Sequence, residues 1–327
     1  MQRTVADGLI KLIVVVGIYI FMGNSGVLSF GSIVYMMIGA YATAWMTLLP
    51  NLKRFTLPGL PGFLIEAQLD PFVSLILAAL LAAAVAFVLA LAIMRTNPIA
   101  ISIATFAAMA MGYTIYNNWE RVTLGTSSII GLPMYVDMWV VFYWALVVMA
   151  IAYIYQISRF GLALRASRED EVAARAFGVN VYIQRVIAFT LSGFVVGIGG
   201  VLHGHFLGIL TVNAFWIQLT FITLAMLVVG GQNSLAGAVV GVIVITAATE
   251  IFRQMEKGAE IGSTLIQLPL GVQEVILGVL MLAIMIFRPA GIMGGREIPW
   301  PFGPPKPIRG GRSRTLETGA GKARTGD

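Results

Sequence analysis

V186-IAFTLSGFVVGIGGVLHGHFLGILTVNAFWIQLTFITLAMLVVGGQNSLAGAVVGVIVITAAT-249 is the run that decides the fold, because it contains no Asp, Glu, Lys or Arg. Charge-free runs also cover residues 12–52 and 96–119. Each run exceeds the roughly 20 residues that a helix needs to cross the hydrocarbon core of a bilayer. Charged residues make up 11% of the chain and apolar residues 58%, whereas a soluble domain has about 25% charged residues. The sequence therefore predicts an all-α, polytopic membrane protein.

Nine apolar segments are candidate membrane spans, and we expect about 8–9 transmembrane helices from them. The segments are 8–22, 27–49, 71–94, 97–118, 136–157, 186–208, 215–231, 235–252 and 268–287. They belong to one predicted transmembrane domain, residues 1–295. Residues 296–327 are rich in Pro, Gly and Arg, with too little apolar surface to fold, and we predict a disordered basic tail there.

Positive charge predicts the orientation of the spans. The stretch 158–185, Arg95 and the residues from Arg288 onward together carry 14 of the 21 Lys and Arg residues. The positive-inside rule places these segments in the cytoplasm. With nine spans the N-terminus then lies outside. The net charge of +6 thus reflects topology, and no nucleic-acid partner is expected.

A charged loop, residues 158–185, interrupts the apolar segments with five Arg and three acidic residues. We predict one short helix over 165–177, stabilised by an i,i+4 pair of Glu171 and Arg175 and ended by Gly178. Two interpretations are open: an amphipathic helix resting on lipid headgroups, or a cytoplasmic helix seated in a groove of another protein. The three adjacent acids favour the second interpretation, because an anionic leaflet repels them.

The stretch F21-MGNSGVLSFGSIVY-35 is uncharged but rich in Gly, Ser and Asn. Transporters use such breaks at membrane depth to line a substrate cavity. The alternative is a short turn at the membrane interface, and both interpretations stay open. The polar side chains of this break are Asn24, Ser25, Ser29 and Ser32.

Sequence motifs give little support for catalysis. G23-NSG-26 has the GxSG pattern of intramembrane serine proteases, with His203 or His205 as a conceivable base. A serine nucleophile needs its base within hydrogen-bond reach, and nothing in the sequence indicates that. There is no Walker A motif and no Cys. We therefore expect no catalytic residue and no metal site.

The predicted spans contain almost no ionisable groups, although ion-coupled carriers and channels usually place such groups in the membrane. This favours a conduit driven by another protein over a self-contained channel. The span S192-GFVVGIGGVLHGHFLG-208 instead carries glycines four residues apart, which let neighbouring helices approach closely. We assign helix packing to Gly193, Gly197, Gly200 and Gly204.

R165-ASREDEVAARAFGV-179, followed by A188-FTLSGFVVGIGGVL-202, resembles the coupling loop of ABC importer permeases, in the version of the branched-chain amino acid permease family. Four further stretches agree with that family in order. They are G26-VLSFGSIVYMMIGAYATA-44, N118-WERVTLGTSSIIGLP-133, V229-GGQNSLAGAVVG-241 and F287-RPAGIMG-294. The second and the last of these favour the LivM type over the LivH type. The resemblance covers about residues 8–295.

The resemblance implies a permease subunit in the cytoplasmic (inner) membrane of a bacterium. It implies as partners a second homologous permease subunit, two cytoplasmic ATP-binding subunits and an extracytoplasmic substrate-binding protein. Membrane lipid would surround the complex. No cofactor is expected in this chain, because the partner subunits would bind ATP. The implied substrates are branched-chain or other hydrophobic amino acids, and the alternatives in the same family are urea, short amides and aromatic acids.

The same resemblance suggests roles for individual residues. ATPase-coupling residues are expected at Arg165, Arg168, Glu169, Glu171, Ala173, Ala174, Phe177 and Gly178. The translocation pathway is expected at Asn24, Ser25, Ser29, Ser32, Thr105 and Phe106. Two stretches depart from the family pattern: Leu124, Thr126 and Ser127 replace glycine-rich positions, and L210-TVNAF-215 lacks a common proline.

Overall fold

The computed structural model describes residues 2–256 and the short pieces 259–261, 264–266, 278–279, 282, 286–288 and 291–294. Residues 1–297 form one compact unit. Seven helices in the described part are long and apolar enough to cross a membrane, and a bent pair of helices raises the number to eight. The chain is thus a polytopic helical membrane protein, as the sequence predicts. Most of the expected span 268–287 and all of the expected tail 296–327 lie outside the described residues.

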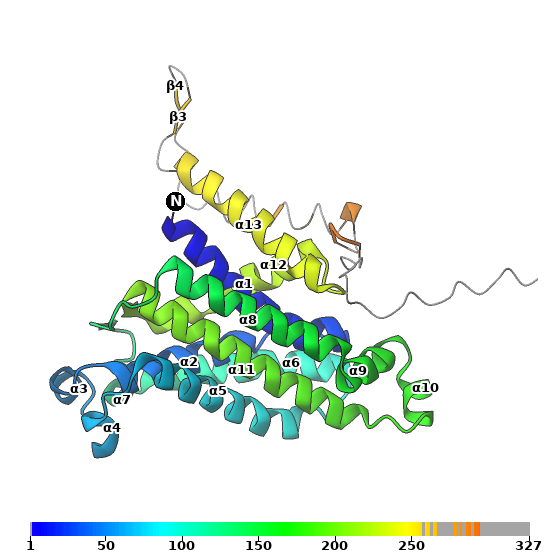
Figure 1. The fold of residues 1–327 in the computed structure, drawn as a ribbon, viewed down its shortest axis with the longest axis horizontal. Helices are drawn as coiled ribbons and strands as arrows, with labels where there is room; N and C mark the ends of the chain where they lie inside the picture. Colours follow the sequence, from blue (N-terminus) through cyan, green and yellow to red (C-terminus); the bar gives the residue numbers. More distant parts are fainter. Residues whose placement is uncertain are drawn as a thin grey trace, which may run out of the picture. The chain divides into compact units, whose positions relative to one another are not determined.

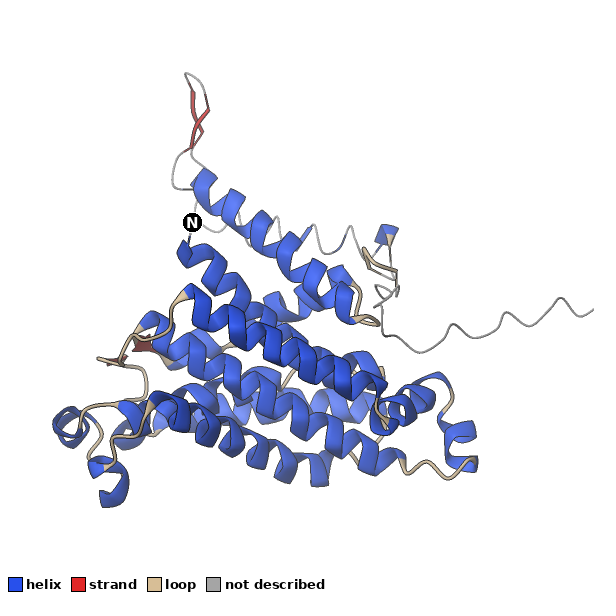
Figure 2. Ribbon diagram, in the orientation of Figure 1, coloured by secondary structure: helices blue, strands red, loops and turns tan. Residues whose placement is uncertain are grey.

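Helices make up most of the described chain (Figure 2). The long helices are α1 (Gln2–Ser25), α2 (Ser32–Thr47), α5 (Pro71–Ile93), α6 (Pro98–Asn118), α8 (Met138–Ile157), α11 (Val181–Leu207), α12 (Ile217–Gly230) and α13 (Leu235–Glu256). The short ones are α3 (Pro50–Thr56), α4 (Gly62–Glu66), α7 (Glu120–Thr123), α9 (Arg159–Glu169), α10 (Glu171–Ala176) and the 3-10 helix η1 (Val212–Phe215). The strands are β1 (Ile129–Ile130), β2 (Ile209–Leu210), β3 (Ala259–Ile261) and β4 (Thr264–Ile266).

Capping side chains set several helix starts. Asp70 and Asn97 accept hydrogen bonds from the first turns of α5 and α6, and each is followed by Pro at the first helical position. Asn180 caps α11 in the same way, through the N–H of Ile183. The helix α11 therefore begins five residues before the predicted start of 186. The prediction failed here because it excluded the charged Arg185 from the span.

The core of the bundle is α11, which packs against α5, α2 and α1 (Figure 1). Helices α1 and α11 are mostly buried, whereas α5, α6 and α8 expose many Leu, Ile and Phe side chains. A bundle that is apolar inside and outside suits a hydrocarbon solvent, in which tight packing rather than the hydrophobic effect holds helices together. The two antiparallel strand pairs are β1–β2, with Ile129 opposite Leu210, and β3–β4.

The predicted packing glycines lie where backbones come closest. A Cβ atom at Gly193 or Gly197 would overlap the alanine methyl groups of Ala86 and Ala82 on α5. A Cβ atom at Gly200 would overlap the main-chain carbonyl of Met36 on α2. Gly204 is less tight, because its nearest neighbour is the end of the Leu210 side chain at 3.2 Å.

The two ends of the bundle differ in their elements. Helices α9 and α10 lie at one end, which we call the charged end, and α3, α4 and α7 lie at the other, the far end (Figure 1). Arg95 is also at the charged end, where its guanidinium lies 5.5 Å from the ring of Tyr182. Helix α1 starts at the far end, where Gln2 and Arg3 share a cavity with the start of α8. The far end is the side that the predicted orientation assigns to the N-terminus.

Candidate functional site

The charged loop contains two helices, and the expectation of one helix over 165–177 was wrong. Helix α9 ends at Glu169, and Asp170 takes an extended conformation with φ −151° and ψ 107°. The Asp170 carboxylate accepts hydrogen bonds from the N–H groups of Val172 and Ala173, so it caps α10. Short acidic side chains compete with helix continuation in this way. The loop is therefore bent at its centre.

The end of α10 follows the sequence prediction more closely. Gly178 has φ +82°, a left-handed conformation that favours glycine after a helix. The predicted ion pair is confirmed, with 2.5 Å between Arg175 Nη2 and Glu171 Oε1. The other carboxylate oxygen of Glu171 accepts from Arg185 Nη2 at 2.9 Å. Glu171 thereby attaches α10 to the first turns of α11.

One side of the charged loop presents apolar side chains to the surroundings. Val172 and Phe177 are 80% and 89% exposed, and Ala173 between them is also exposed. Ala174 faces inward and is buried. These side chains form a small exposed apolar surface on an otherwise charged segment. The predicted coupling residues thus divide between an exposed side and an inward side.

Arg165 points from α9 into the bundle. Its Nε donates to Asn24 Oδ1 at 2.7 Å, and its Nη2 donates to the hydroxyl of Tyr19 at 2.7 Å. The Tyr19 hydroxyl donates to Gln156 Oε1 at 3.0 Å. The planar guanidinium suits this two-pronged contact. Arg165 therefore joins the charged loop to the last turns of α1 and α8.

Arg168 makes a second connection. Its Nη1 donates to the main-chain oxygen of Gly23 at 2.8 Å and to Asn233 Oδ1 at 3.2 Å, between α12 and α13. Its Nη2 lies 2.7 Å from Glu169. The methylene groups of Arg168 lie against Gly26, and a Cβ atom added at Gly26 would overlap them. The charged loop is thus bonded to the break between α1 and α2.

The structure places the predicted pathway residues of this break at the charged end, buried within the protein. Asn24, Ser25, Ser29 and Ser32 are at most 5% exposed. Ser25 Oγ accepts from the N–H of Val27. The polar side chains of the break are therefore covered by protein, whereas Gly26 and Leu28 between them are exposed.

Thr105 and Phe106 lie on α6 beside the same break. Thr105 Oγ1 accepts from the N–H of Phe30 at 3.3 Å. The ring of Phe106, which is 40% exposed, meets the ring of Phe30 edge-on, with centroids 6.4 Å apart. Thr105 and Phe106 thereby contact the break at Phe30.

The histidines lie away from Ser25, at the far end. His205 Nδ1 lies 2.9 Å from the carbonyl oxygen of Pro133, and so donates to it, while Nε2 pairs with Thr43 Oγ1 at 2.9 Å. His203 meets the ring of Phe215. No histidine is therefore available as a base for Ser25, and the protease interpretation fails on geometry. Within the described residues no group of three His, Cys, Asp or Glu is arranged to hold a metal ion.

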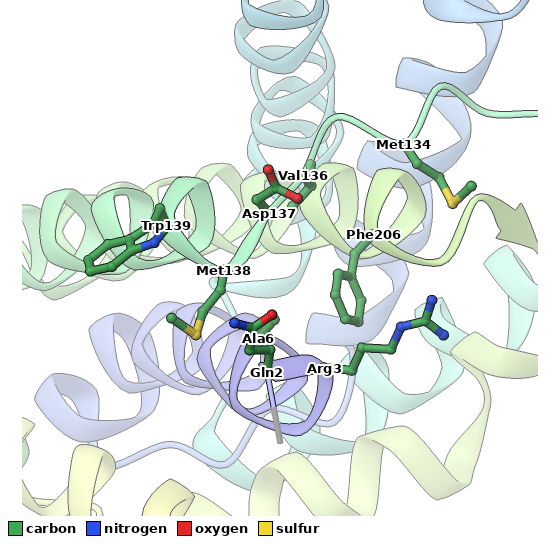
Figure 3. A pocket seen from close by; sticks show the side chains of 9 residues that line it. All are labelled: Gln2, Arg3, Ala6, Met134, Val136, Asp137, Met138, Trp139 and Phe206. Atoms are coloured by element: carbon green, nitrogen blue, oxygen red, sulfur yellow. The ribbon is translucent and has the colours of Figure 1, made fainter.

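A cavity of about 450 Å³ opens at the far end, between the start of α1 and the start of α8 (Figure 3). It is lined by Gln2, Arg3, Ala6, Met134, Val136, Asp137, Met138, Trp139 and Phe206. None of the predicted pathway residues is among them. This cavity and the break between α1 and α2 are thus separate features at opposite ends.

Sequence reasoning missed Tyr19 and Gln156, which complete the network around Arg165. Both lie in apolar spans, and a lone Tyr or Gln there gives no pattern from which a partner can be inferred. It also missed the role of Lys53, which is fully buried. The Lys53 ammonium donates to the carbonyl oxygens of Leu64 and Ala67 at the end of α4.

A family model described as the permease component of branched-chain amino acid transport systems matches residues 1–285. The chain belongs to this family. The family model covers the charged loop, the break and all eight long helices of the described part. The bundle and its apolar surface also indicate a multi-pass membrane protein.

Curated relatives share parts of the chain. The probable branched-chain amino acid transport permease protein LivM of Methanocaldococcus jannaschii is 29% identical over 42% of this chain and 41% of its own length. The LivM permease of Escherichia coli K12 is 28% identical over 45% of this chain and 32% of its own. The LivH permease of Salmonella typhimurium is 28% identical over 49% and 47%. The chain thus spans less than half the length of the curated relatives it matches.

Proposed function

We propose that this permease forms half of the membrane pathway of an ABC importer in a bacterial inner membrane. It carries branched-chain or other hydrophobic amino acids, and ATP hydrolysis on partner subunits drives the transport. The partners are a second homologous permease, two cytoplasmic ATPases and an extracytoplasmic binding protein. The names of the LivM and LivH relatives support the solute class.

The observation that carries this proposal is the two-sided charged loop. Its exposed side, with Val172 and Phe177, offers apolar contacts to an ATPase. Its inward side holds Arg165 and Arg168, which bond to the end of α1. Displacement of the loop by an ATPase would therefore move the polar break at Asn24 directly, because charge-assisted hydrogen bonds resist separation at low dielectric.

The test uses the whole complex, made from this chain and the ATPases, second permease and binding protein encoded beside it, reconstituted in liposomes. We expect ATP-dependent uptake of radiolabelled leucine, and no uptake without ATP. Urea, acetamide and benzoate serve as competing solutes. Leucine uptake that does not depend on ATP would contradict the proposal. So would a complex that hydrolyses ATP but takes up no leucine.

A charge at the exposed side of the loop gives a sharper test. We expect Phe177→Asp to remove co-purification of the ATPases and ATP-driven uptake, because a carboxylate in an apolar contact is left unpaired. The matched control is Phe55→Asp, which changes an equally exposed Phe at the far end and should leave ATPase co-purification intact. Equal ATPase binding by both variants would show that the loop is not the ATPase contact.

A further inference from the structure

Helix α6 has two different faces outside the core of the bundle. One is apolar, with Ile103 and Met111 exposed by 65% and 63%, and it suits lipid. The other is a stripe of polar and aromatic side chains at positions 102, 106, 113 and 117, in which Phe106 is exposed and Ser102, Tyr113 and Asn117 are half-buried. At 100° per residue these four positions fall within about 60° of one another. Polar groups in a span are costly against lipid and usually face protein or a water-filled space.

The helix α12 lies across from this stripe, and both helices pack on α2. Its outward residues include Gln218 and Phe221, which are exposed, and η1 adds the exposed Asn213 just before it. The stripe of α6 and this face of α12 thus flank α2 as two walls of uncharged polar and aromatic groups. No Lys, Arg, Asp or Glu occurs in α6 or between 186 and 249.

Two aromatic layers connect the walls. In the layer toward the far end, the Tyr113 ring lies 3.9 Å from the Trp216 ring, measured between centroids. The Tyr113 hydroxyl donates to Asn213 Oδ1 at 2.5 Å. In the layer toward the charged end, the Phe30 ring contacts Phe106 and Phe221 edge-on, at 6.4 and 6.5 Å.

The spacing of the layers sets the size of what can lie between them. Phe106 and Tyr113 are seven residues apart on α6, which is about 10 Å along a helix. A free amino acid is no longer than that spacing. Between the layers, Thr220 Oγ1 donates to Met109 Sδ at 3.1 Å, so side chains of α6 and α12 are in contact at this level.

We propose that these two layers bound a transit site for one small, net-neutral solute, with Tyr113, Asn213 and Trp216 as its outer gate and Phe30, Phe106 and Phe221 as its inner gate. The phenol and the carboxamide are neutral groups that exchange hydrogen bonds with an amino, carboxyl or amide group of the solute. The rings accept its apolar part, and Trp216 and Tyr113 also attract an ammonium group. Opening the outer gate breaks the Tyr113–Asn213 hydrogen bond, which the solute then replaces.

This inference rests on the proposed function, and its test separates the two. The chain has no cysteine, so single-cysteine variants can be made without background in this subunit. In the whole complex, without nucleotide, Tyr113→Cys and Asn213→Cys are treated with a water-soluble methanethiosulfonate. We expect both cysteines to be labelled. When binding protein saturated with leucine is added, the labelling rate of both should fall about tenfold, which corresponds to about 1.4 kcal/mol. Met111→Cys, on the apolar face of α6, is the control and should resist labelling.

Removal of one hydroxyl tests the gate itself. Tyr113→Phe keeps the ring on Trp216 but loses the hydrogen bond, and we expect the maximal rate of leucine uptake to fall about tenfold. The leucine concentration at half-maximal uptake should stay the same, because the binding protein sets it. The control is Tyr143→Phe, which changes a 63% exposed Tyr on α8 and should transport at the unaltered rate.

The outcomes are distinct. The first outcome is that the unaltered complex imports leucine, but Met111→Cys is labelled as fast as Asn213→Cys, or leucine does not slow the labelling. In that case the proposal of a transit site is wrong and the proposed function stands. The transit site is equally wrong if Tyr113→Phe transports at the unaltered rate. If the unaltered complex hydrolyses ATP but imports no leucine, the proposed function itself fails, whatever the labelling shows.

Discussion

Arg165 and Arg168 are the side chains that bond the charged loop to the end of α1. Each makes at least one charge-assisted hydrogen bond there, to Asn24 and to the carbonyl oxygen of Gly23. Arg159, near the start of the same helix, instead lies over the ring of its neighbour Phe160. Three arginines within ten residues therefore differ in role, and only their three-dimensional contacts distinguish them.

We predict that Arg165→Lys uncouples ATP hydrolysis from uptake in the reconstituted complex. A lysine has a single ammonium in place of the planar fork, so it cannot reproduce the separate Nε and Nη2 hydrogen bonds to Asn24 and Tyr19 in their present geometry. Loss of one hydrogen bond to a charged group costs about 1.5–3 kcal/mol, so uptake per ATP hydrolysed should fall about tenfold or more. Arg159→Lys is the control on the same helix, and unchanged coupling in Arg165→Lys would contradict the role proposed for this arginine.

The helices are held together by close backbone approach at the level of whole elements. In α11, glycines and small residues meet α5 and α2, where Gly193 and Gly197 face alanines and Gly200 faces a main-chain carbonyl. Such packing provides many small dispersion contacts, and a membrane offers little hydrophobic driving force to replace them. The glycine series thus explains why α11 can occupy the centre of the bundle.

We predict that Gly200→Ala destabilises the bundle by about 1–3 kcal/mol, because even the added methyl group has to displace the carbonyl of Met36. The measurement is the midpoint of thermal unfolding of the purified complex in detergent, followed by tryptophan fluorescence. Gly204→Ala is the matched control, since its nearest neighbour is a flexible leucine end. A similar midpoint for both variants would show that this contact does not limit packing.

At the scale of the whole molecule, the two ends of the bundle should face opposite sides of the membrane. Phe55 on α3 and Phe177 beside α10 are both more than 85% exposed, and they lie at the far end and the charged end. We predict that Phe55→Cys is labelled by an impermeant maleimide added to intact spheroplasts, whereas Phe177→Cys is labelled only after the membrane is opened. Labelling of both in intact spheroplasts would overturn the positive-inside orientation.

Much of the fold follows from the sequence, because charge-free runs longer than a bilayer crossing leave few alternatives. The helix type, the approximate spans and the place of the charged loop were predictable for that reason. The bend at Asp170 was not, since an aspartate can continue a helix or cap the next one, and the choice depends on where the loop must turn. The start of α11 was also missed, because Glu171 neutralises Arg185 only after the loop has folded back.

The candidate site shows the same division. Composition and motifs alone predicted a helical membrane permease with a charged loop, because these properties depend on local runs of residues. Only the tertiary structure decided which arginines turn inward and that Tyr113, Asn213 and Trp216 meet. These residues lie about 100 positions apart in the chain. Contacts of that kind depend on how helices pack, and a single sequence has no local signal for them.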